Sequence, residues 1–446
     1  MANTYLTRTS GTPTNALKWT FSAWVKLSEV INGDRWLLDF YTDGVNRSQI
    51  GWTNDNSKPQ LIVYELVSSS ASQLFTSAQA FRDTSSFYNI VVSCDRTLAT
   101  AADRTKIYIN GERMTSFHTT PTYPSQNVTG IINTAVGTLI GKYNQSGIYY
   151  NGLMSHVNFV DGTAYPASTF GSTDSSTGEW KINTSPSVTY GNNGFFILKD
   201  GNSVTDQSGN SNNFTVAGGT LTKTEDCPDN VFCTLNPLGH ASANFTLIEG
   251  SLYSGGADNN WRSIFGTIGS SSGKYYYEMK VIGHNNEHVG IASADQIAHC
   301  SDSSGKFTDN SFGAEGYSYT SGGQKANNGS EVSWGNSYTT NDIIGVAFDL
   351  DNSKLYFSKN GTWQESGDPT SGATGTGAAY TLVANKIYLP AMASYNAASN
   401  MAFNFGNGYF RTTAISSAGT NASGNGIFEY DVPTGYTALS TKGLNL

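Results

Sequence analysis

The sequence predicts an all-β protein built from two antiparallel β-sandwiches. Three observations lead to this fold class. Short segments along the chain place an apolar residue at every second position, which is the period of half-buried strands. Turn residues separate these segments, and no helical period runs between them. Charged residues make up only 13% of the chain, and 48 of its 446 residues are glycine, whereas soluble proteins average roughly 25% charged residues and roughly 7% glycine.

The first sandwich begins with a strand at residues 18–27, KWTFSAWVKL, where apolar and smaller or polar residues alternate. The polar residues 1–16 before it are expected to form an extended arm or an edge strand. Further strands are predicted at residues 34–40, 49–52, 60–67, 87–94 and 105–111. Strands at this spacing, without helices between them, predict a sandwich.

Residues 1–172 resemble a known family in the order of their motifs. FSAWVK is followed by FYNIVVSCDR, KIYINGERM and TLIGKYNQSGIYYNGLMSHVNFVDGTAYPASTFG. This order is similar to that of a laminin-G or pentraxin-type domain, which implies a concanavalin A-like sandwich of the jelly-roll type. Such domains often hold calcium at their rim, but no acidic cluster in this sequence matches those ligands. Asp43, Asp55 and Asp161 each stand beside Gly or Asn, so we expect turn residues there and no cofactor.

Residues 173–242 are predicted to be an ordered connector that completes the first domain. GFFILKD supplies a strand, DQSGNSN a tight polar turn, and Pro228 and Pro237 stiffen an extended link. The run GEWKINTSPSVTYGNNGFFILKDGNSVTDQSGNSNNFTVAGG and the following DCPDNVFCTLNPLGH resemble a recurring segment of tailed-phage proteins. In those proteins the segment follows a laminin-G-like domain, so the resemblance implies a bacteriophage source.

The second sandwich is predicted over residues 243–425 and is clearest at residues 341–363, NDIIGVAFDLDNSKLYFSKNGTW. Two alternating strands are joined there by the turn Asp351-Asn352-Ser353. Asn360-Gly361 supplies the positive backbone angles that a second tight turn needs. The stretch is therefore a β-meander with one face in a core.

The same half of the chain resembles a SPRY domain, a concanavalin-like sandwich used as an interaction module. The resemblance rests on residues 341–363 together with GKYYYEMKVIG, HVGIASADQ and YLPAMASYNAASNMAFNFGNGYF. The Leu-Asp-Pro block of the longer tripartite-motif relatives is absent, so their peptide-binding residues are not carried over. After this half, residues 426–446 are predicted to be an extended tail that must dock on a surface to be ordered. Their sequence YDVPTGYTALSTKGLNL resembles a closing segment of the same phage proteins.

Charge and composition exclude several classes of partner. The formal net charge is −9, and without a cluster of Lys and Arg a nucleic-acid partner is not expected. The chain has no run of 18 apolar residues and does not start like a signal peptide, so membrane insertion is not expected and synthesis takes place in the host cytoplasm. Cys94 lies in an apolar strand and is expected to be a buried thiol. Cys227 and Cys233 lack zinc-site spacing, and the sequence leaves open whether they pair.

Catalysis is not expected either. Retaining glycosidases of concanavalin-like fold place two Glu and an Asp on one strand as Glu-x-Asp-x-x-Glu, because alternation then points all three into one cleft. That pattern does not occur in this sequence. No Gly-x-Ser-x-Gly elbow is followed by a helix, and no phosphate loop is present. His284 and His288 have no helix to place them on one face, so we expect no metal pair.

These observations predict a phage virion protein, either a tail-fibre or tail-associated component or a decoration protein. It would act as a binding module for a host-surface glycan or receptor, with other virion proteins as partners and a homo-oligomer by analogy with fibres. One alternative is a purely structural capsid or tail accessory protein that binds only other virion proteins. A weaker alternative is a polysaccharide-degrading enzyme.

A ligand site is expected in loops of the second sandwich, where aromatic faces stand near amide and hydroxyl groups. The candidate residues are Asn260, Trp261, Tyr317, Tyr319, Trp334 and Tyr338. The alternative for each aromatic residue is a place in the core or in an interface.

Overall fold

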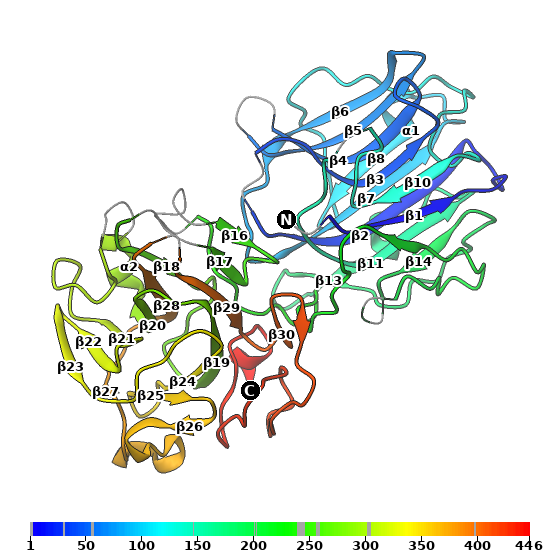
Figure 1. The fold of residues 1–446 in the computed structure, drawn as a ribbon. Coiled ribbons are helices and arrows are strands. Elements are labelled where there is room, and N and C mark those ends of the chain that lie inside the picture. The colour runs from blue at the N-terminus through cyan, green and yellow to red at the C-terminus, as the bar shows by residue number, and fades with distance from the viewer. Residues whose placement is uncertain are drawn as a thin grey trace. The chain divides into compact units, whose positions relative to one another are not determined.

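The computed structural model describes residues 3–29, 32–54, 58–145, 147–199, 201, 203–238, 246–255, 259–300, 305–396 and 398–446, without the side chains of 246 and 298–300. The chain is 42% strand and 6% helix, which confirms the all-β fold class. It divides into two compact units, Met1–Lys223 and Thr224–Leu446, and each is drawn in Figure 1. The division falls inside the expected connector. Asp55 of the sequence analysis lies outside the described residues.

The first unit contains two large antiparallel sheets. The seven-stranded sheet has the order β15 (Thr215–Ala217), β1 (Tyr5–Thr9), β10 (Gly137–Ile140), β3 (Arg35–Tyr41), β4 (Arg47–Thr53), β5 (Gln60–Val67) and β6 (Ser70–Ala80). The six-stranded sheet has the order β14 (Phe195–Ile197), β11 (Gly152–Asp161), β2 (Lys18–Leu27), β7 (Phe87–Asp95), β8 (Thr105–Ile109) and β9 (Glu112–Arg113). A small pair is formed by β12 (Gly171–Thr173) and β13 (Trp180–Ile182), and α1 (Ala101–Arg104) is a single helical turn.

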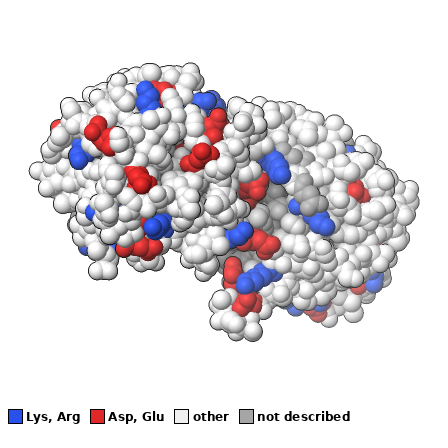
Figure 2. All heavy atoms as spheres, turned by 90° about the horizontal axis from the view of Figure 1, so that it is seen from below, with Lys and Arg blue, Asp and Glu red and all other residues white. Residues whose placement is uncertain are grey.

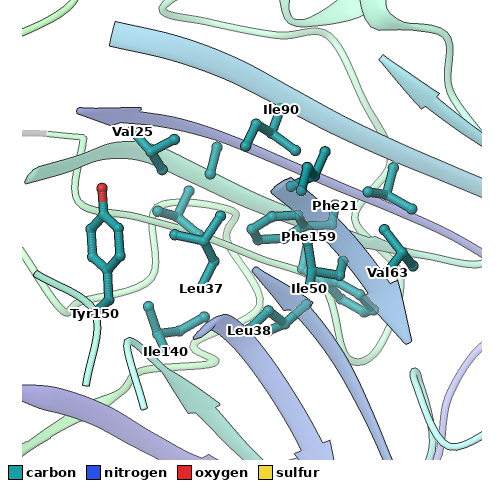
Figure 3. Packing of buried hydrophobic residues seen from close by; sticks show 14 of the residues in the cluster. Phe21, Val25, Leu37, Leu38, Ile50, Val63, Ile90, Ile140, Tyr150 and Phe159 are labelled. Atoms are coloured by element: carbon teal, nitrogen blue, oxygen red, sulfur yellow. The ribbon is translucent and has the colours of Figure 1, made fainter. Parts of the chain in front are cut away.

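The apolar core of this unit lies between the two sheets (Figure 3). Trp19, Phe21, Ala23 and Val25 on β2 are all buried in it, which confirms the predicted alternation. Residues 1–16 were expected to form an extended arm or an edge strand, but β1 is not at the edge of its sheet. It pairs with β10 on one side and with β15 on the other, because the connector returns to the sheet and supplies the edge.

A register shift in β3 decides which side chains face outward. The pairing of β3 with β4 is irregular between Trp36 and Leu38, and both Leu37 and Leu38 belong to the core. A β-bulge places two consecutive residues on one face in this way. As a result, Trp36 and Asp39 lie on the outer face of the seven-stranded sheet.

The second unit also contains two large sheets. One has the order β16 (Thr246–Ile248), β17 (Tyr253–Gly255), β29 (Asn400–Asn404), β19 (Lys274–Gly283), β24 (Ile343–Asp349), β25 (Lys354–Lys359) and β26 (Thr362–Trp363), with β27 (Tyr380–Thr381) beside β25 and β32 (Thr437–Ala438) beside β19. The other has the order β18 (Arg262–Phe265), β28 (Tyr388–Ser394), β20 (Glu287–Ser293), β21 (Gly316–Thr320), β22 (Gln324–Asn327) and β23 (Ser330–Ser333). The remaining elements are α2 (Ala294–Cys300) and the pair β30 (Tyr409–Phe410) and β31 (Thr413–Ala414).

The predicted meander is present as β24 and β25. Ile344, Val346 and Phe348 from β24 and Leu355 and Phe357 from β25 are fully buried in the core of this unit. The turn between the two strands begins after Asp349. The prediction for residues 341–363 is therefore confirmed in both strands.

The end of the connector and the C-terminal segment pack together in the second unit. The amide of Cys233 donates to the carbonyl of Leu439 at 3.0 Å, and the amide of Thr441 donates to the carbonyl of Val231 at 2.9 Å. Phe428, Val432 and Tyr436 of the C-terminal segment join Phe232, Tyr276 and Tyr356 in a separate apolar cluster. The C-terminal segment is thus docked over the outer face of β19 and β25.

Candidate functional site

The outer face of the seven-stranded sheet carries a group of aromatic side chains, which we call the tyrosine face. Strand alternation places them there, because their neighbours Leu6, Phe40 and Val63 point into the core. Residues 142–145 and 147–149, in the loop that follows β10, add two more rings. The tyrosine face consists of Tyr5, Trp36, Tyr41, Tyr64, Tyr143 and Tyr149. All five tyrosines are half-buried, so part of each ring meets solvent.

Two cations are held between pairs of these rings. The Nζ of Lys142 lies 4.3 Å from the ring centroid of Tyr5 and 5.7 Å from that of Tyr149. The guanidinium of Arg47 lies 5.8 Å from the ring of Tyr64 and 5.6 Å from that of Tyr143. A cation above a ring face is attracted by the ring quadrupole. The tyrosine face therefore contains the same arrangement twice, one cation between two tyrosines.

A buried carboxylate fastens the loop to the sheet between these two arrangements. The Oδ2 of Asp39 accepts a hydrogen bond from the amide of Asn144 at 2.9 Å and one from the Nε2 of Gln49 at 3.2 Å. Burial raises the pKa of Asp39 to about 7, although both hydrogen bonds and the nearby Arg47 oppose the shift. The loop thus crosses above β3, with Asn144 over Asp39.

Three buried polar atoms on this face have no hydrogen-bond partner among the described residues. They are the Nε1 of Trp36, the Oδ1 of Asp39 and the Oδ1 of Asn144. A buried polar group without a partner costs roughly 1–3 kcal/mol. Because these three atoms are buried, the groups that a ligand can contact on the tyrosine face are its half-buried rings and the half-buried cations Lys142 and Arg47.

In the second unit, the predicted residues Asn260 and Trp261 lie just before β18. Asn260 is exposed and Trp261 is half-buried. The ring of Trp261 packs edge-on against His288 at 4.9 Å and lies 5.6 Å from Tyr395, while the Nζ of Lys306 stands 5.2 Å from it. Burial lowers the pKa of His288 to about 3, so this imidazole is neutral at physiological pH. His288, Tyr395 and Lys306 thus occupy part of the surroundings of the Trp261 ring, and the half-buried ring keeps some contact with solvent.

The other four residues predicted for the ligand site do not form one surface with Asn260 and Trp261. Tyr317, Tyr319 and Tyr338 are 4%, 0% and 2% exposed and belong to the core. The hydroxyl of Tyr338 donates to the carbonyls of Glu287 and Tyr319 within that core. Trp334 is half-buried, with its ring 5.5 Å from Tyr319. The structure thus gives the three tyrosines the alternative role, packing in the core, because a ligand at the surface cannot reach them.

Three further properties concern metal ligands, membrane-spanning helices and the thiol of Cys94. Within the described ranges, no group of three or more His, Cys, Asp and Glu side chains could hold a metal ion. No helix in the same residues is long and apolar enough to cross a membrane. Cys94 is fully buried, as predicted.

Comparison with known proteins now assigns both units. Residues 2–169 match the profile of the Concanavalin A-like lectin/glucanases superfamily, and residues 274–408 match that of the SPRY domain. The first unit contains a concanavalin A-like domain, and the second contains a SPRY domain. The tyrosine strands β1, β3 and β5 and the loop 142–149 all lie inside the concanavalin A-like match. Asn260 and Trp261 precede the SPRY match, whereas Tyr317, Tyr319, Trp334 and Tyr338 lie inside it.

Individual relatives match only parts of the chain. An ATP-dependent RNA helicase DDX1 from Xenopus laevis is 28% identical over 127 residues, which are 28% of this chain and 16% of the helicase. The chain therefore spans about a sixth of that relative's length. Among solved structures, the SPRY domain of human HERC1 has 17% identity and a TM-score of 0.28, covering 36% of this chain and 91% of that domain. Another human SPRY domain has 12% identity and a TM-score of 0.27, covering 36% and 94%. Stonustoxin has 16% identity and a TM-score of 0.27, covering 39% and 27%.

Sequence reasoning did not single out the tyrosine face. In QLIVYELV, Tyr64 stands next to Val63, so alternation alone sends its ring to the outer face once Val63 is in the core. The sequence gives no such signal for Tyr5 and Lys142, which are far apart in the chain. Only the pairing of β1 with β10 brings them together.

Proposed function

We propose that the chain is a non-enzymatic binding module on the surface of a tailed-phage virion, and that it attaches the particle to a glycan on the host surface. The tyrosine face carries this proposal. Tyrosine presents a flat apolar ring and a polar tip, which suits a ligand with one apolar and one hydroxyl-bearing side. A sugar ring has these two sides. Binding sites of this type combine aromatic walls with a few fixed polar groups.

The rigidity of the sheet supports the same proposal. Three of the five tyrosines stand on strands β1, β3 and β5, whose alternate residues are locked in the core. The loop that supplies the other two is held by the bond between Asn144 and Asp39. A preorganised face loses little conformational entropy on binding. Tyrosine adds to this advantage because its side chain has few rotatable bonds.

The phage context rests on the two segments that resemble phage proteins. One ends at residue 240 and the other spans residues 430–446, and their backbones are hydrogen-bonded to each other through Cys233 and Leu439. Charged side chains are sparse and of mixed sign on the face drawn in Figure 2, which suits a particle surface better than a nucleic-acid interface. Other virion proteins are the expected partners, and the particle surface is the expected location.

The experiment is a binding assay with labelled full-length protein and host cells, with and without competing host-surface polysaccharide. The proposal predicts saturable binding that the polysaccharide abolishes. It also predicts that the double variant Tyr64→Ala/Tyr143→Ala loses this binding. Trp261→Ala in the second unit serves as the matched aromatic control and should bind as the unmodified chain does.

The purely structural alternative makes the opposite prediction. For a capsid or tail accessory protein, neither the unmodified chain nor the tyrosine double variant would bind host cells, yet both would still assemble with other virion proteins. Hydrolysis of the polysaccharide during the assay would favour the enzymatic alternative. Loss of binding in Trp261→Ala alone would move the site to the second unit.

A further inference from the structure

We infer that the tyrosine face selects an acidic polysaccharide, whose carboxylate groups bind Lys142 and Arg47 while its sugar rings pack on the neighbouring tyrosines. This inference rests on the proposed function and narrows its ligand class. It starts from the two cations, because a neutral glycan would not require them.

Lys142 and Arg47 differ in their partners from Lys18 and Arg35, two other cations of the first unit. Lys18 is paired with Asp95 at 3.0 Å, and Arg35 is paired with Glu29 at 2.7 Å. Among the residues that the structure describes, Lys142 and Arg47 form no ion pair with a carboxylate, and they stand over tyrosine rings instead. A ring attracts a cation without neutralising it. The guanidinium of Arg47 also donates hydrogen bonds to the carbonyl of Gly44 and to the Oε1 of Gln49, both of which are uncharged acceptors. Neither the rings nor these acceptors neutralise the two cations, so an anionic ligand is attracted to both.

Two acidic side chains near the cations, Asp39 and Asp43, accept hydrogen bonds from other groups of the protein. Asp39 is fully buried and bonded to Asn144 and Gln49, and its raised pKa leaves it partly neutral near pH 7. Asp43 lies in the turn between β3 and β4, where its carboxylate accepts hydrogen bonds from the amides of Val45 and Asn46. In the part of the chain that the structure describes, neither acid forms an ion pair with Lys142 or Arg47, although Arg47 lies near enough to Asp39 to lower its pKa. Repulsion of an anionic ligand is thus weaker than the number of carboxylates suggests.

The spacing of the cations fits a polymer. Tyr5, which Lys142 covers, is on β1, and Arg47 is on β4, with β10 and β3 between them. Neighbouring strands lie about 4.8 Å apart, so three intervals separate these positions by at least about 14 Å. Each cation stands over its own pair of rings, and a chain of several sugars is long enough to cover both pairs. Two equivalent arrangements of one cation and two rings suit a chain with a repeating acidic sugar.

The test uses the full-length protein and a panel of four immobilised acidic polysaccharides: polygalacturonate, alginate, hyaluronan and polysialic acid. Methyl-esterified polygalacturonate and dextran are the uncharged counterparts. We expect at least one acidic polymer to bind in a salt-sensitive manner and more tightly than both uncharged polymers. Lys142→Gln and Arg47→Gln should each weaken that binding by about tenfold, the size expected for one charge-assisted hydrogen bond.

The control is Lys181→Gln, since Lys181 is a surface cation on β13, paired with Asp174 at 2.7 Å and away from the tyrosine face. It should bind like the unmodified chain. Thermal unfolding of every variant verifies that it is folded. Equal losses of binding in Lys142→Gln and Lys181→Gln would overturn the inference. Single-stranded DNA is measured in the same assay, and tighter binding of this polymer than of every polysaccharide would also overturn it.

The two proposals fail in different ways. If host cells or an uncharged polymer bind, and the tyrosine double variant abolishes this binding while Lys142→Gln and Arg47→Gln do not, the acidic ligand class is wrong and the proposed function stands. If neither cells nor any polymer bind the folded protein, both proposals fall.

Discussion

The carboxylate of Glu278 and the backbone amide of Tyr430 are joined by a hydrogen bond of 2.8 Å. The same carboxylate accepts from the amide of Glu429 at 2.9 Å and from the Nδ2 of Asn404 at 3.1 Å. Glu278 lies on β19 and is fully buried, and burial raises its pKa to about 7. One side chain of the central strand thus fastens the C-terminal segment to the SPRY sheet.

Removing this carboxylate should release the segment. Glu278→Ala leaves two part-buried backbone amides without their acceptor, and each costs at most roughly 1–3 kcal/mol, the penalty for a fully buried donor. We expect lower stability of the second unit and rapid protease cleavage after residue 415, seen by mass spectrometry. Glu365→Gln, at an exposed site, is the control. Cleavage of Glu278→Ala no faster than that of the control would show that the segment is held elsewhere.

The pKa of Asp39 predicts the pH dependence of the first unit. Burial raises it from 3.8 to about 7, so the folded chain holds this proton more tightly than the unfolded chain. Its contribution is complete below about pH 4 and is lost as the pH rises through 7. A shift of this size corresponds to at most about 4 kcal/mol. Urea unfolding between pH 4 and pH 8 should show this decline in the unmodified chain and a flatter profile in Asp39→Asn, and parallel profiles would contradict the assignment.

Glu65 and Arg96 form a buried ion pair in the concanavalin A-like core. Their side chains are 1% and 2% exposed, and the closest nitrogen and oxygen atoms are 2.8 Å apart. Removing one partner of such a pair costs about 3–5 kcal/mol, because the other charge stays buried. Arg96→Met should therefore destabilise the first unit by this amount in urea unfolding. Lys181→Met breaks a surface ion pair and should change stability by less than about 1 kcal/mol. Similar losses of stability in both variants would contradict the larger contribution assigned to the buried pair.

Tyr319 should act through packing and not through a ligand. Its ring is fully buried, 5.1 Å from Tyr338 and 5.6 Å from Phe357. Truncating a buried aromatic residue costs about 3–5 kcal/mol. Tyr319→Ala is expected to lower the melting temperature of the SPRY unit and to leave polysaccharide binding of the folded protein unchanged. A binding loss at full stability would place a ligand at this residue after all.

The sequence predicted strands well where alternation was strong and the side chains large. The strand β2 and the meander of β24 and β25 are examples. β6 was missed because SASQLFTSAQA is mostly polar, and it is a strand only through its pairing with β5. The face of Tyr317 and Tyr319 was also undecided, since alternation shows that they share a face but not which one. Their neighbours Gly316, Ser318 and Thr320 are small, and the larger rings fill the core instead.

The tyrosine face lay beyond sequence reasoning for a different reason. Its rings come from strands that pair only after the chain has folded, and the outward position of Trp36 depends on a bulge in β3. Residue spacing does not reveal such a bulge. The resemblances indicated a binding fold in each half, but they did not give the position of the site.

The most direct test of a glycan-binding tyrosine face is the affinity of host-surface polysaccharide for the unmodified chain and for Tyr64→Ala/Tyr143→Ala, measured on equally folded preparations. We expect saturable binding by the unmodified chain and a loss of at least about fivefold in the double variant, since stacking on an aromatic ring contributes about 0.5–1.5 kcal/mol per ring. Equal affinities of the two proteins would contradict the account, because the sugar would then be bound somewhere other than this face.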